Sequence, residues 1–497
     1  MPASAISLPM QRQASRLAIA LAIAMAAPSW ADSPPPPEHA ARAHAAPFEM
    51  RVLATGLANP HNMVLGPDGH LWLTELLGRR ILRVDTSTGG VTVLANVSDA
   101  VHTRTSSGEG QDGLLGIALH PDLLQGKDRD YVFVSLTYAA GRGGEFPNAT
   151  AIRRYTYDRA SGQLVSPVDI LAGLPSSHDH QSARLLFGPD GALYYSIGDQ
   201  GANQRAYLCT PNLAQALPTA AQVAGRDWSP YAGKVLRLNL DGSIPADNPV
   251  IRGVRSHIYA WGWRNPQGMV FAPDGKLFAA DHGPNSDDEL NLVLPGRNYG
   301  WPHVAGRKDD AAYAYANFSA ARGGCAGIAA AARGGQVVPP EVPVARESEW
   351  SDPDYAEPLK TFFTVPTGHD FRHPLCAAGG LYFTCWPSIA PSSVAYYPAG
   401  GAAPGWGPSL LLASLKRGMI YRVPLDAATG LPAGSAQPVL RTQNRYREVV
   451  AARDGRTLYV ATDSVGLTTS DEGRATSALA HPGAILVFRY TPQPPAR

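Results

Sequence analysis

A short phrase recurs along this chain and constrains its fold more than any other feature. Each copy joins a Pro-Asp-Gly or Asp-Gly turn to an alternating apolar segment, and the copies begin at Gly66, Gly188, Ala272 and Arg453. Proline presets φ for a tight turn, aspartate caps the turn and glycine accepts positive φ. The residues after each turn are therefore predicted to form a half-buried β-strand.

Two weaker signals extend this pattern. A degenerate copy starts at His120, and segments 410–414 and 420–423 predict a further hairpin. The 50 glycines, 44 prolines and low charged fraction of 17% favour short strands over long helices. Radial repetition of four-stranded units protects strand edges. We therefore predict one all-β domain over residues 48–497, a six-bladed β-propeller with four-stranded antiparallel blades; a pair of β-sandwiches is the alternative.

The N-terminus has the layout of an export signal. Two arginines precede an apolar run over residues 17–27, and small residues follow it up to Ala31. We predict a signal peptide over residues 1–31 and a Pro-rich linker over residues 32–47, with a periplasmic or secreted mature chain. The apolar run is shorter than the about 20 residues that a membrane span needs, so no membrane span is expected. A retained anchor is the alternative.

Cysteines and net charge narrow the classes of function. Cys376 and Cys385 are close enough in sequence to staple one loop, whereas Cys209 and Cys325 could pair or stay free. No Cys-x-x-Cys occurs, which argues against a thiolate zinc site. The formal net charge of +1 gives no field that would attract nucleic acid, and no nucleic-acid partner is expected.

Three polar segments between the repeats carry candidate chemistry. The first contains His178-Asp-His180, with Asp199 to Gln204 beyond the next predicted strand. A histidine beside carboxylates suits a general base, because a carboxylate orients the ring and stabilises the imidazolium. A surface histidine, or a weak metal pair of His178 and His180, is the alternative.

The second and third segments suggest a cation site and an anion site. Hard oxygen donors crowd residues 281–291, which suits Ca²⁺, although a solvated acidic turn would look similar. Lys416, Arg445 and Arg447 could together hold a multiply anionic small ligand. Cross-strand pairing of these cations with Asp or Glu is the competing interpretation.

Taken together, these segments resemble the soluble glucose dehydrogenases that depend on pyrroloquinoline quinone (PQQ). The resemblance runs from about Leu53 to Tyr490, essentially the whole predicted domain. The strings that match in order are Gly110-Gln-Asp-Gly-Leu-Leu-Gly116, Asp179-His-Gln-Ser182, Gly198-Asp-Gln-Gly201, Arg264-Asn-Pro-Gln-Gly268, Gly283-Pro-Asn-Ser-Asp-Asp-Glu289, Asn298-Tyr-Gly-Trp-Pro302 and Ser414-Leu-Lys-Arg-Gly418.

The resemblance implies an enzyme that oxidises the C1 hydroxyl of an aldose such as glucose to the lactone. His180 would take the hydroxyl proton while hydride passes to C5 of the quinone, and Asp179 and Asp199 would support the base. Electrons would leave to an external acceptor, a cytochrome, quinone or dye. The sequence leaves the oligomeric state open, and a homodimer is among the states that it allows.

The resemblance also assigns residues to PQQ and Ca²⁺. Gln111 and Gln204 would contact the substrate beside the cofactor, and Arg264 and Asn265 would stabilise negative charge on the quinone oxygen. The remaining cofactor-binding residues would be Trp386, Ser388, Lys416, Arg445 and Arg447. The metal-binding residues would be Gly283 and Pro284 at the cofactor, and Glu289, Tyr299, Ala305, Asp309 and Glu347 at structural calcium.

Several departures from the family pattern bear on the substrate. Trp263, Phe383 and Ser388 stand where the family has His, Tyr and Thr, and the loop over residues 364–384 is rewritten. Another aldose or a sorbosone-type sugar is therefore the alternative substrate. A non-catalytic propeller that binds a protein is the alternative from another class. Residues 320–335 are expected to form a flexible surface loop.

Overall fold

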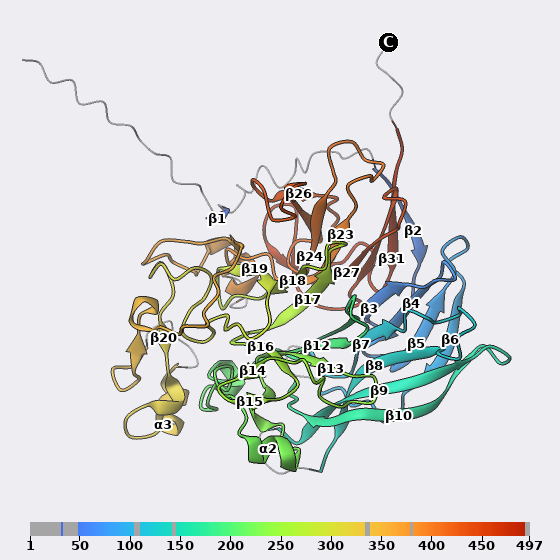
Figure 1. Ribbon diagram of the computed structural model, residues 1–497. Helices are drawn as coiled ribbons and strands as arrows, with labels where there is room; N and C mark the ends of the chain where they lie inside the picture. Colours follow the sequence, from blue (N-terminus) through green and yellow to red (C-terminus); the bar gives the residue numbers. More distant parts are fainter. Residues whose placement is uncertain are drawn as a thin grey trace, which may run out of the picture.

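Six four-stranded antiparallel sheets make up a β-propeller in the part of the chain that the computed structural model describes (Figure 1). The described residues are 31–32, 48–103, 110–141, 146–332, 338–377 and 381–492. The predicted signal peptide and Pro-rich linker lie outside them, apart from Ala31 and Asp32, which form β1 (Ala31–Asp32). The predicted all-β propeller is confirmed.

The blades follow one another along the chain. The first three are β3 (Pro60–Leu65), β4 (Leu71–Glu75), β5 (Arg80–Val84) and β6 (Val91–Asn96); β7 (Leu114–Leu119), β8 (Tyr131–Ala139), β9 (Asn148–Asp158) and β10 (Gln163–Leu174); and β11 (Ser182–Phe187), β12 (Leu193–Ile197), β13 (Lys234–Leu238) and β16 (Ile258–Trp261). The next two are β17 (Pro266–Phe271), β18 (Leu277–Asp281), β19 (Asp288–Val293) and β22 (Lys360–Phe362), with β1 beside β22; and β23 (Pro391–Tyr397), β24 (Ser409–Ser414), β25 (Met419–Pro424) and β26 (Gln437–Val439). The last is β27 (Tyr446–Ala451), β28 (Thr457–Thr462), β31 (Ile485–Tyr490) and β2 (Phe48–Ala54).

Short elements fill the loops between the blades. The additional strands are β14 (Val250–Ile251), β15 (Val254–Arg255), β20 (Tyr315–Ala316), β21 (Val344–Ala345), β29 (Thr468–Thr469) and β30 (Ala475–Thr476). The helices are η1 (Arg205–Tyr207), α2 (Ala220–Gly225), η2 (Ser229–Tyr231), η3 (Phe318–Ala320), α3 (Cys325–Ala332), η4 (Glu347–Glu349), η5 (Pro374–Cys376) and η7 (Tyr382–Cys385). None of the described helices has the length and hydropathy needed to cross a membrane.

The ring closes through its last blade. Strand β2, from the N-terminal part of the domain, pairs antiparallel with β31, with Phe48 opposite Tyr490 (Figure 1). The first strands of the blades contact one another in turn, and β27 of the last blade contacts β3 of the first. Closure removes the open edges that a row of separate sheets would expose.

The recurring phrase marks the hairpin between the first and second strands of four blades. In the first copy Asp68 accepts a hydrogen bond from the amide of His70 (3.2 Å), and Gly69 has φ of +75°. The equivalent aspartates Asp190, Asp274 and Asp454 cap their turns in the same way. Each turn is thus built from local contacts, which explains why the phrase is legible in the sequence.

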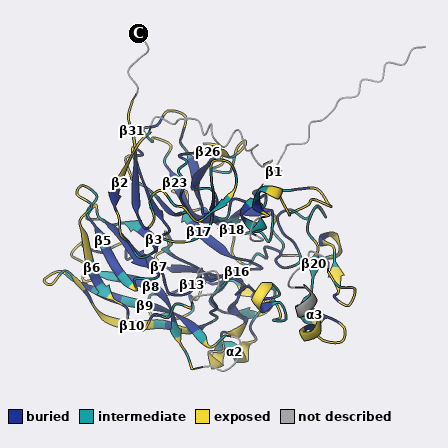
Figure 2. Ribbon diagram, turned by 180° about the vertical axis from the view of Figure 1, so that it is seen from behind, coloured by how far each residue is buried: buried dark blue, intermediate teal, exposed yellow. Residues whose placement is uncertain are grey.

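The blades pack through apolar faces, and their first strands are buried in the interior (Figure 2). Between the last and first blades, for example, Tyr459 and Val487 pack with Leu71 and Leu82. The outer strand β10 carries mostly exposed residues. The faces between blades are therefore mostly apolar.

Buried polar groups cross the centre of the ring. Arg184 on β11 forms an ion pair with Glu448 on β27 (2.5 Å) and donates to the carbonyls of Gln267 and Ser392. Asn62 on β3 also donates to Glu448 (3.2 Å). These contacts tie five first strands together across the axis.

Removing Glu448 should therefore destabilise the propeller. Glu448→Ala would leave the Arg184 charge buried and unpaired, and the expected loss of unfolding free energy is about 3 to 5 kcal/mol. Denaturant unfolding checks this, with Glu341→Ala at an exposed position as the control. Equal stability of the two variants would contradict a structural role for the ion pair.

Both cysteine pairs are disulfides. Cys376–Cys385 is confirmed, and Cys209 pairs with Cys325, the choice that the sequence left open. The flexible loop expected over residues 320–335 is wrong in part, because residues 325–332 form helix α3. Its alanine-rich sequence has high helix propensity, and the Cys209–Cys325 bond fixes its first residue.

Candidate active site at the channel mouth

The predicted site residues meet at one end of the ring. Each blade's first strand begins, and its second strand ends, at this same end because the two strands are antiparallel. Residues just before or at the start of first strands are Gln111, Asp179, His180, Arg264, Asn265, Trp386, Ser388, Arg445 and Arg447; residues just after second strands are Asp199, Gln204, Gly283, Pro284 and Lys416. Residues that belong to different blades, and are far apart in sequence, therefore lie together in one cluster of loops.

His180 is held by a buried carboxylate. Its Nδ1 lies 2.6 Å from Oδ1 of Asp199, and an ionised carboxylate only accepts hydrogen bonds, so Nδ1 carries the proton. Asp199 also accepts from the indole of Trp301 (2.6 Å), the side chain of Asn212 (2.9 Å) and the amide of Gly201 (2.9 Å). Among the residues that the structure describes, none forms a hydrogen bond with Nε2 of His180.

Asp179 lies on the other side of the ring of His180. Its Oδ1 is 3.7 Å from Nε2 of His180 and accepts from the side chain of Gln111 (3.2 Å). Burial alone would raise the pKa of Asp179, but the charges of His180, Arg205 and Arg264 outweigh burial and hold the pKa below its usual value. Asp179 is therefore kept as a carboxylate.

The second histidine of the segment has other contacts. Nδ1 of His178 lies 2.7 Å from the hydroxyl of Tyr207, and its carbonyl accepts from the amide of Gln111. The two histidines thus have different partners. Within the described ranges no three His, Cys, Asp or Glu side chains form a metal-binding group, so the histidine metal pair gains no support.

Arg264 supplies a buried guanidinium near Asp199, whose amide donates to the Arg264 carbonyl (2.8 Å). It donates to the carbonyl of His282 (3.2 Å) and to Oε1 of Gln204 (2.7 Å), and its guanidinium lies 5.4 Å from the ring centre of Trp301. Burial lowers the pKa of Arg264. Among the described residues, Nε of Arg264 and Nε2 of Gln204 are buried donors without a partner. A bound ligand with acceptor oxygens would satisfy them.

Gln267 was not predicted as a site residue, although it stands in the Arg-Asn-Pro-Gln-Gly string. Its Nε2 donates to Oε1 of Gln111 (3.2 Å), and its Oε1 accepts from Arg447 (3.2 Å). Asn265 donates to the same oxygen of Gln111 (3.2 Å). Gln267 therefore links Arg447, through Gln111, to Asp179 beside His180.

Arg445 and Arg447 share one carboxylate. Nε of Arg445 lies 2.9 Å from Asp463, and Nε of Arg447 lies 2.7 Å from its other oxygen. Burial would raise the pKa of Asp463, but the two arginines outweigh burial and lower it. Cross-strand pairing, the competing interpretation, thus occurs. Two guanidinium groups on one carboxylate still leave a net positive charge at the site.

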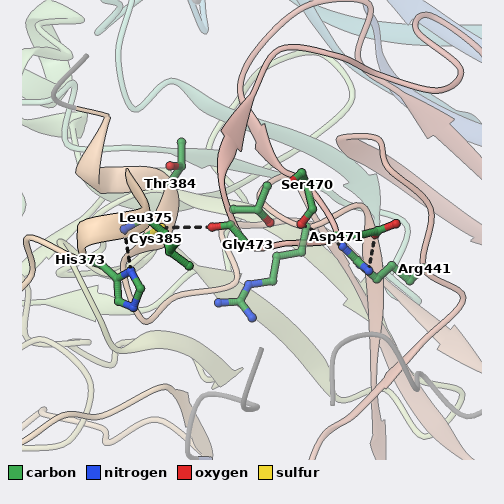
Figure 3. Close-up of a pocket in the computed structure, with 10 residues that line it drawn as sticks. His373, Leu375, Thr384, Cys385, Arg441, Ser470, Asp471 and Gly473 are labelled. Carbon is green, nitrogen blue, oxygen red and sulfur yellow. Dashed lines mark hydrogen bonds and ion pairs between the residues drawn. The ribbon is translucent and has the colours of Figure 1, made fainter. Parts of the chain in front are cut away.

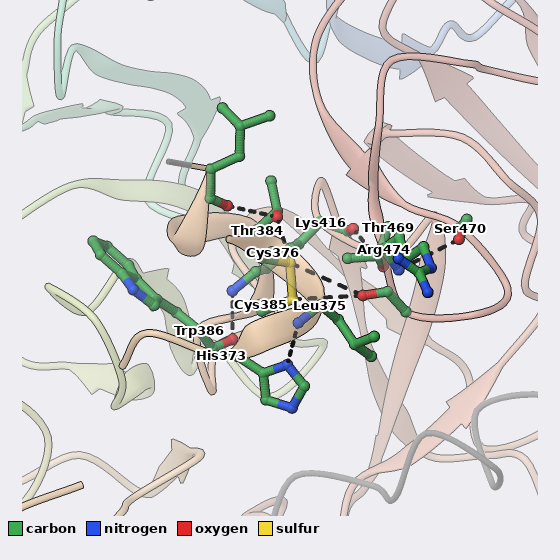
Figure 4. The surroundings of a disulfide bond; sticks show 12 residues. His373, Leu375, Cys376, Thr384, Cys385, Trp386, Lys416, Thr469, Ser470 and Arg474 are labelled. Atoms are coloured by element: carbon green, nitrogen blue, oxygen red, sulfur yellow. Dashed lines mark hydrogen bonds between the residues drawn. A yellow bond between two sulfur atoms is a disulfide. The ribbon is translucent and has the colours of Figure 1, made fainter. Parts of the chain in front are cut away.

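Lys416 is a buried cation that contacts neutral acceptors. Its Nζ donates to the carbonyl of Trp386 and to Oγ of Ser388 (3.1 Å). No described carboxylate lies within 4.0 Å of it, and burial, followed by the charge of Arg417, holds the pKa of Lys416 well below its usual value. Figure 4 shows Lys416 and Trp386 beside the Cys376–Cys385 disulfide. An anionic ligand group would stabilise this ammonium.

Arg205 is a second residue that the sequence did not reveal. Its guanidinium lies 5.6 Å from the ring centre of Phe383 and 6.0 Å from that of Trp386. It follows Gln204, which contacts Arg264, so helix η1 and the loop of the disulfide face each other at the rim. No motif marked it, because its partners come from a loop far along the chain.

The loop after β18 has features of a cation site. Gly283 donates its amide to Asp288 (2.9 Å), and a Cβ at Gly283 would lie 1.9 Å from the carbonyl oxygen of Ser286. In the described part of the chain, the carbonyl oxygens of Gly283 and Pro284 accept no hydrogen bond. Free backbone carbonyls are ligands that Ca²⁺ uses, so these residues fit the ion.

The second predicted metal set is only partly assembled. Glu289 accepts from the amide of Gly306 (2.7 Å), and Glu347 accepts from the neighbouring amide of Ala305 (2.9 Å) and from Asp309 (3.2 Å). Burial raises the pKa of Glu347 to about 7. Tyr299 stacks on Trp263 with ring centres 3.9 Å apart. Backbone amides, rather than one another, are the nearest partners of these two carboxylates.

Comparisons with known proteins show the family of the chain. The Glucose / Sorbosone dehydrogenase family matches residues 57–324 and 367–469. The chain is 47% identical over 465 residues to quinoprotein glucose dehydrogenase B of Acinetobacter calcoaceticus, covering 93% of this chain and 95% of that protein. It is 32% identical over 265 residues to aldose sugar dehydrogenase YliI of Escherichia coli, covering 52% and 62%.

A solved structure supports the same assignment. The PQQ-bound aldose sugar dehydrogenase of Streptomyces coelicolor superposes with a TM-score of 0.58 at 26% identity, covering 89% of this chain and 98% of that one. The family match spans most of the propeller and includes the loops that carry His180 and Arg264. The chain is an enzyme of the glucose/sorbosone dehydrogenase family.

Proposed function

We propose that this enzyme oxidises the C1 hydroxyl of an aldose to the lactone, using PQQ and Ca²⁺. The observation that carries the proposal is the His180–Asp199 pair beside Arg264, at the end of the ring where Lys416, Arg445 and Arg447 also lie. The name of the Acinetobacter quinoprotein and the PQQ-bound Streptomyces structure support the cofactor.

In this proposal His180 is the general base. Its Nε2 takes the C1 hydroxyl proton, and Asp199 stabilises the imidazolium through Nδ1. Asp179 adds negative charge beside the ring, and Gln111 and Gln204 position the sugar. The contact with Asp199 thus fixes the orientation of the ring, with Nε2 turned toward Asp179.

The cationic residues bind and orient the cofactor. Lys416, Arg445 and Arg447 pair with its carboxylates, Trp386 and Ser388 line its place, and Arg264 with Asn265 donates where negative charge develops. When bound, PQQ would supply the acceptor for hydride; the carbonyls of Gly283 and Pro284 would hold Ca²⁺, which would supply Lewis-acid polarisation. Glu289, Tyr299, Ala305, Asp309 and Glu347 are proposed to hold structural calcium.

The proposal extends to the location, electron acceptor, oligomeric state and substrate of the enzyme. Export through residues 1–31 is consistent with two disulfides, which persist in oxidising compartments. Electrons leave to an external cytochrome, quinone or dye, and a homodimer is allowed. Phe383, which contacts Arg205, stands where the family has Tyr. Other aldoses and sorbosone-type sugars are therefore candidate substrates beside glucose. A non-catalytic propeller would not need the assembled base.

Reconstitution tests the function. Apoprotein should show dye-linked sugar oxidation only when PQQ and Ca²⁺ are both supplied, because the carbonyl and cationic groups each need their own ligand. A panel of aldoses with either component omitted measures this. Equal activity with a nicotinamide cofactor alone, or full activity in strong chelator without PQQ, would overturn the proposal.

A further inference from the structure

A cavity of about 90 Å³ lies between the loop of the Cys376–Cys385 disulfide and the segment that contains Ser470 and Asp471 (Figure 3). Its wall includes Arg417, Arg441, His373, Thr469 and the disulfide residue Cys385. Pockets for drug-sized ligands measure about 300 to 1,000 Å³. The cavity is therefore too small for a quinone cofactor or a sugar, and it has room for a small ion.

Two guanidinium groups line this cavity, those of Arg417 and Arg441. The terminal nitrogens of Arg441 contact Asp471 (2.6 Å) and the carbonyl of Ser470 (3.3 Å). The side chain of Arg417 makes no hydrogen bond with a described residue, so its terminal nitrogens are donors that a ligand acceptor would satisfy. Nδ1 of His373 accepts from the amide of Leu375 (3.3 Å), which leaves Nε2 as a further donor.

The charge of the cavity is positive. Asp471 is the carboxylate in its lining; it pairs with Arg441 (2.6 Å), and its side chain is 69% exposed. Arg417 forms no ion pair within 4.0 Å in the described part of the chain. One guanidinium charge therefore faces the cavity without compensation.

The cavity adjoins the proposed cofactor group without sharing its polar atoms. Arg417 follows Lys416 in the β24–β25 turn, and the carbonyl of Lys416 accepts from Thr468 (2.9 Å) and from the amide of Thr469 (3.0 Å). The ammonium of Lys416 instead contacts Trp386 and Ser388. The turn thus directs Lys416 to the proposed cofactor site and Arg417 to the cavity.

We propose that the cavity binds one small oxyanion of the sulfate and phosphate class between Arg417 and Arg441. Guanidinium groups bind such anions through charge-assisted hydrogen bonds, and the terminal nitrogens of Arg417 supply donors that no described residue uses. Occupancy would join the disulfide loop to the segment after β28. This site does not depend on the proposed sugar oxidation.

Calorimetric titration of the full chain with sulfate, at constant ionic strength in chloride, tests the proposal. Wild type should bind one sulfate saturably, with a matching rise in the melting temperature. Arg417→Gln should weaken binding at least tenfold, and Arg417→Lys, which keeps the charge, should weaken it less. Arg453→Gln, at an exposed arginine, is the matched control and should bind like wild type.

Other probes separate the alternatives. Inorganic phosphate should compete with sulfate, and acetate should compete poorly. Unchanged binding in both Arg417 variants, or a non-saturating rise in melting temperature that is the same in every variant, would overturn the site, since sulfate also stabilises proteins by exclusion from their surface. Displacement of sulfate by PQQ would also overturn it, because the cavity would then belong to the cofactor site.

Discussion

Replacing His180 by alanine is expected to lower the rate of cofactor reduction by about 10²- to 10⁴-fold while PQQ remains bound, since that is the usual contribution of a general base. In the structure Asp199 holds the ring by Nδ1, and Nε2 is left for the substrate proton. His180 is not one of the cationic residues that would bind the cofactor. Its removal should therefore lower the rate of cofactor reduction without weakening PQQ binding.

The matched control for this prediction is His178→Ala. His178 contacts Tyr207 instead of a buried carboxylate, so its loss should change the rate little. Cofactor reduction should be followed in a single turnover, because steady-state rates can be limited by reoxidation. If His180→Ala reduces its cofactor at the native rate and His178→Ala does not, the base has been assigned to the wrong histidine.

Replacing Arg447 by alanine is expected to weaken PQQ binding by about 2 to 5 kcal/mol, the usual cost of truncating one member of a buried charged pair. The structure adds a second reason. Arg447 and Arg445 both pair with Asp463. Without Arg447, one positive charge remains beside one negative charge, so the net positive charge that would attract an anionic cofactor is lost. Cofactor titration of the apoprotein, followed by fluorescence quenching, measures the loss.

Two further variants separate the causes. Asp463→Asn removes the shared carboxylate and keeps both guanidinium groups, so it should not weaken binding as Arg447→Ala does. Arg453→Ala, at an exposed position, should bind like wild type. Unchanged titration of Arg447→Ala would mean that this arginine serves only the ion pair with Asp463.

Local sequence was sufficient for the turns, the strands and one disulfide. In each Pro-Asp-Gly turn the aspartate caps an amide two residues away, so the signal is contained in a few residues. Cys376 and Cys385 are also near neighbours, and their pairing was predicted correctly. The Asp-His-Gln-Ser string placed His180 and Asp179 in one short segment for the same reason.

Only the tertiary structure decided contacts between blades. Asp199 meets Trp301, Arg447 meets Asp463, Cys209 meets Cys325, and Arg205 meets Phe383 across long stretches of chain. These partners are chosen by closure of the ring, which brings the ends of distant strands to one mouth. A turn depends on the φ preferences and hydrogen bonds of adjacent residues, whereas a contact between blades depends on where every intervening blade packs.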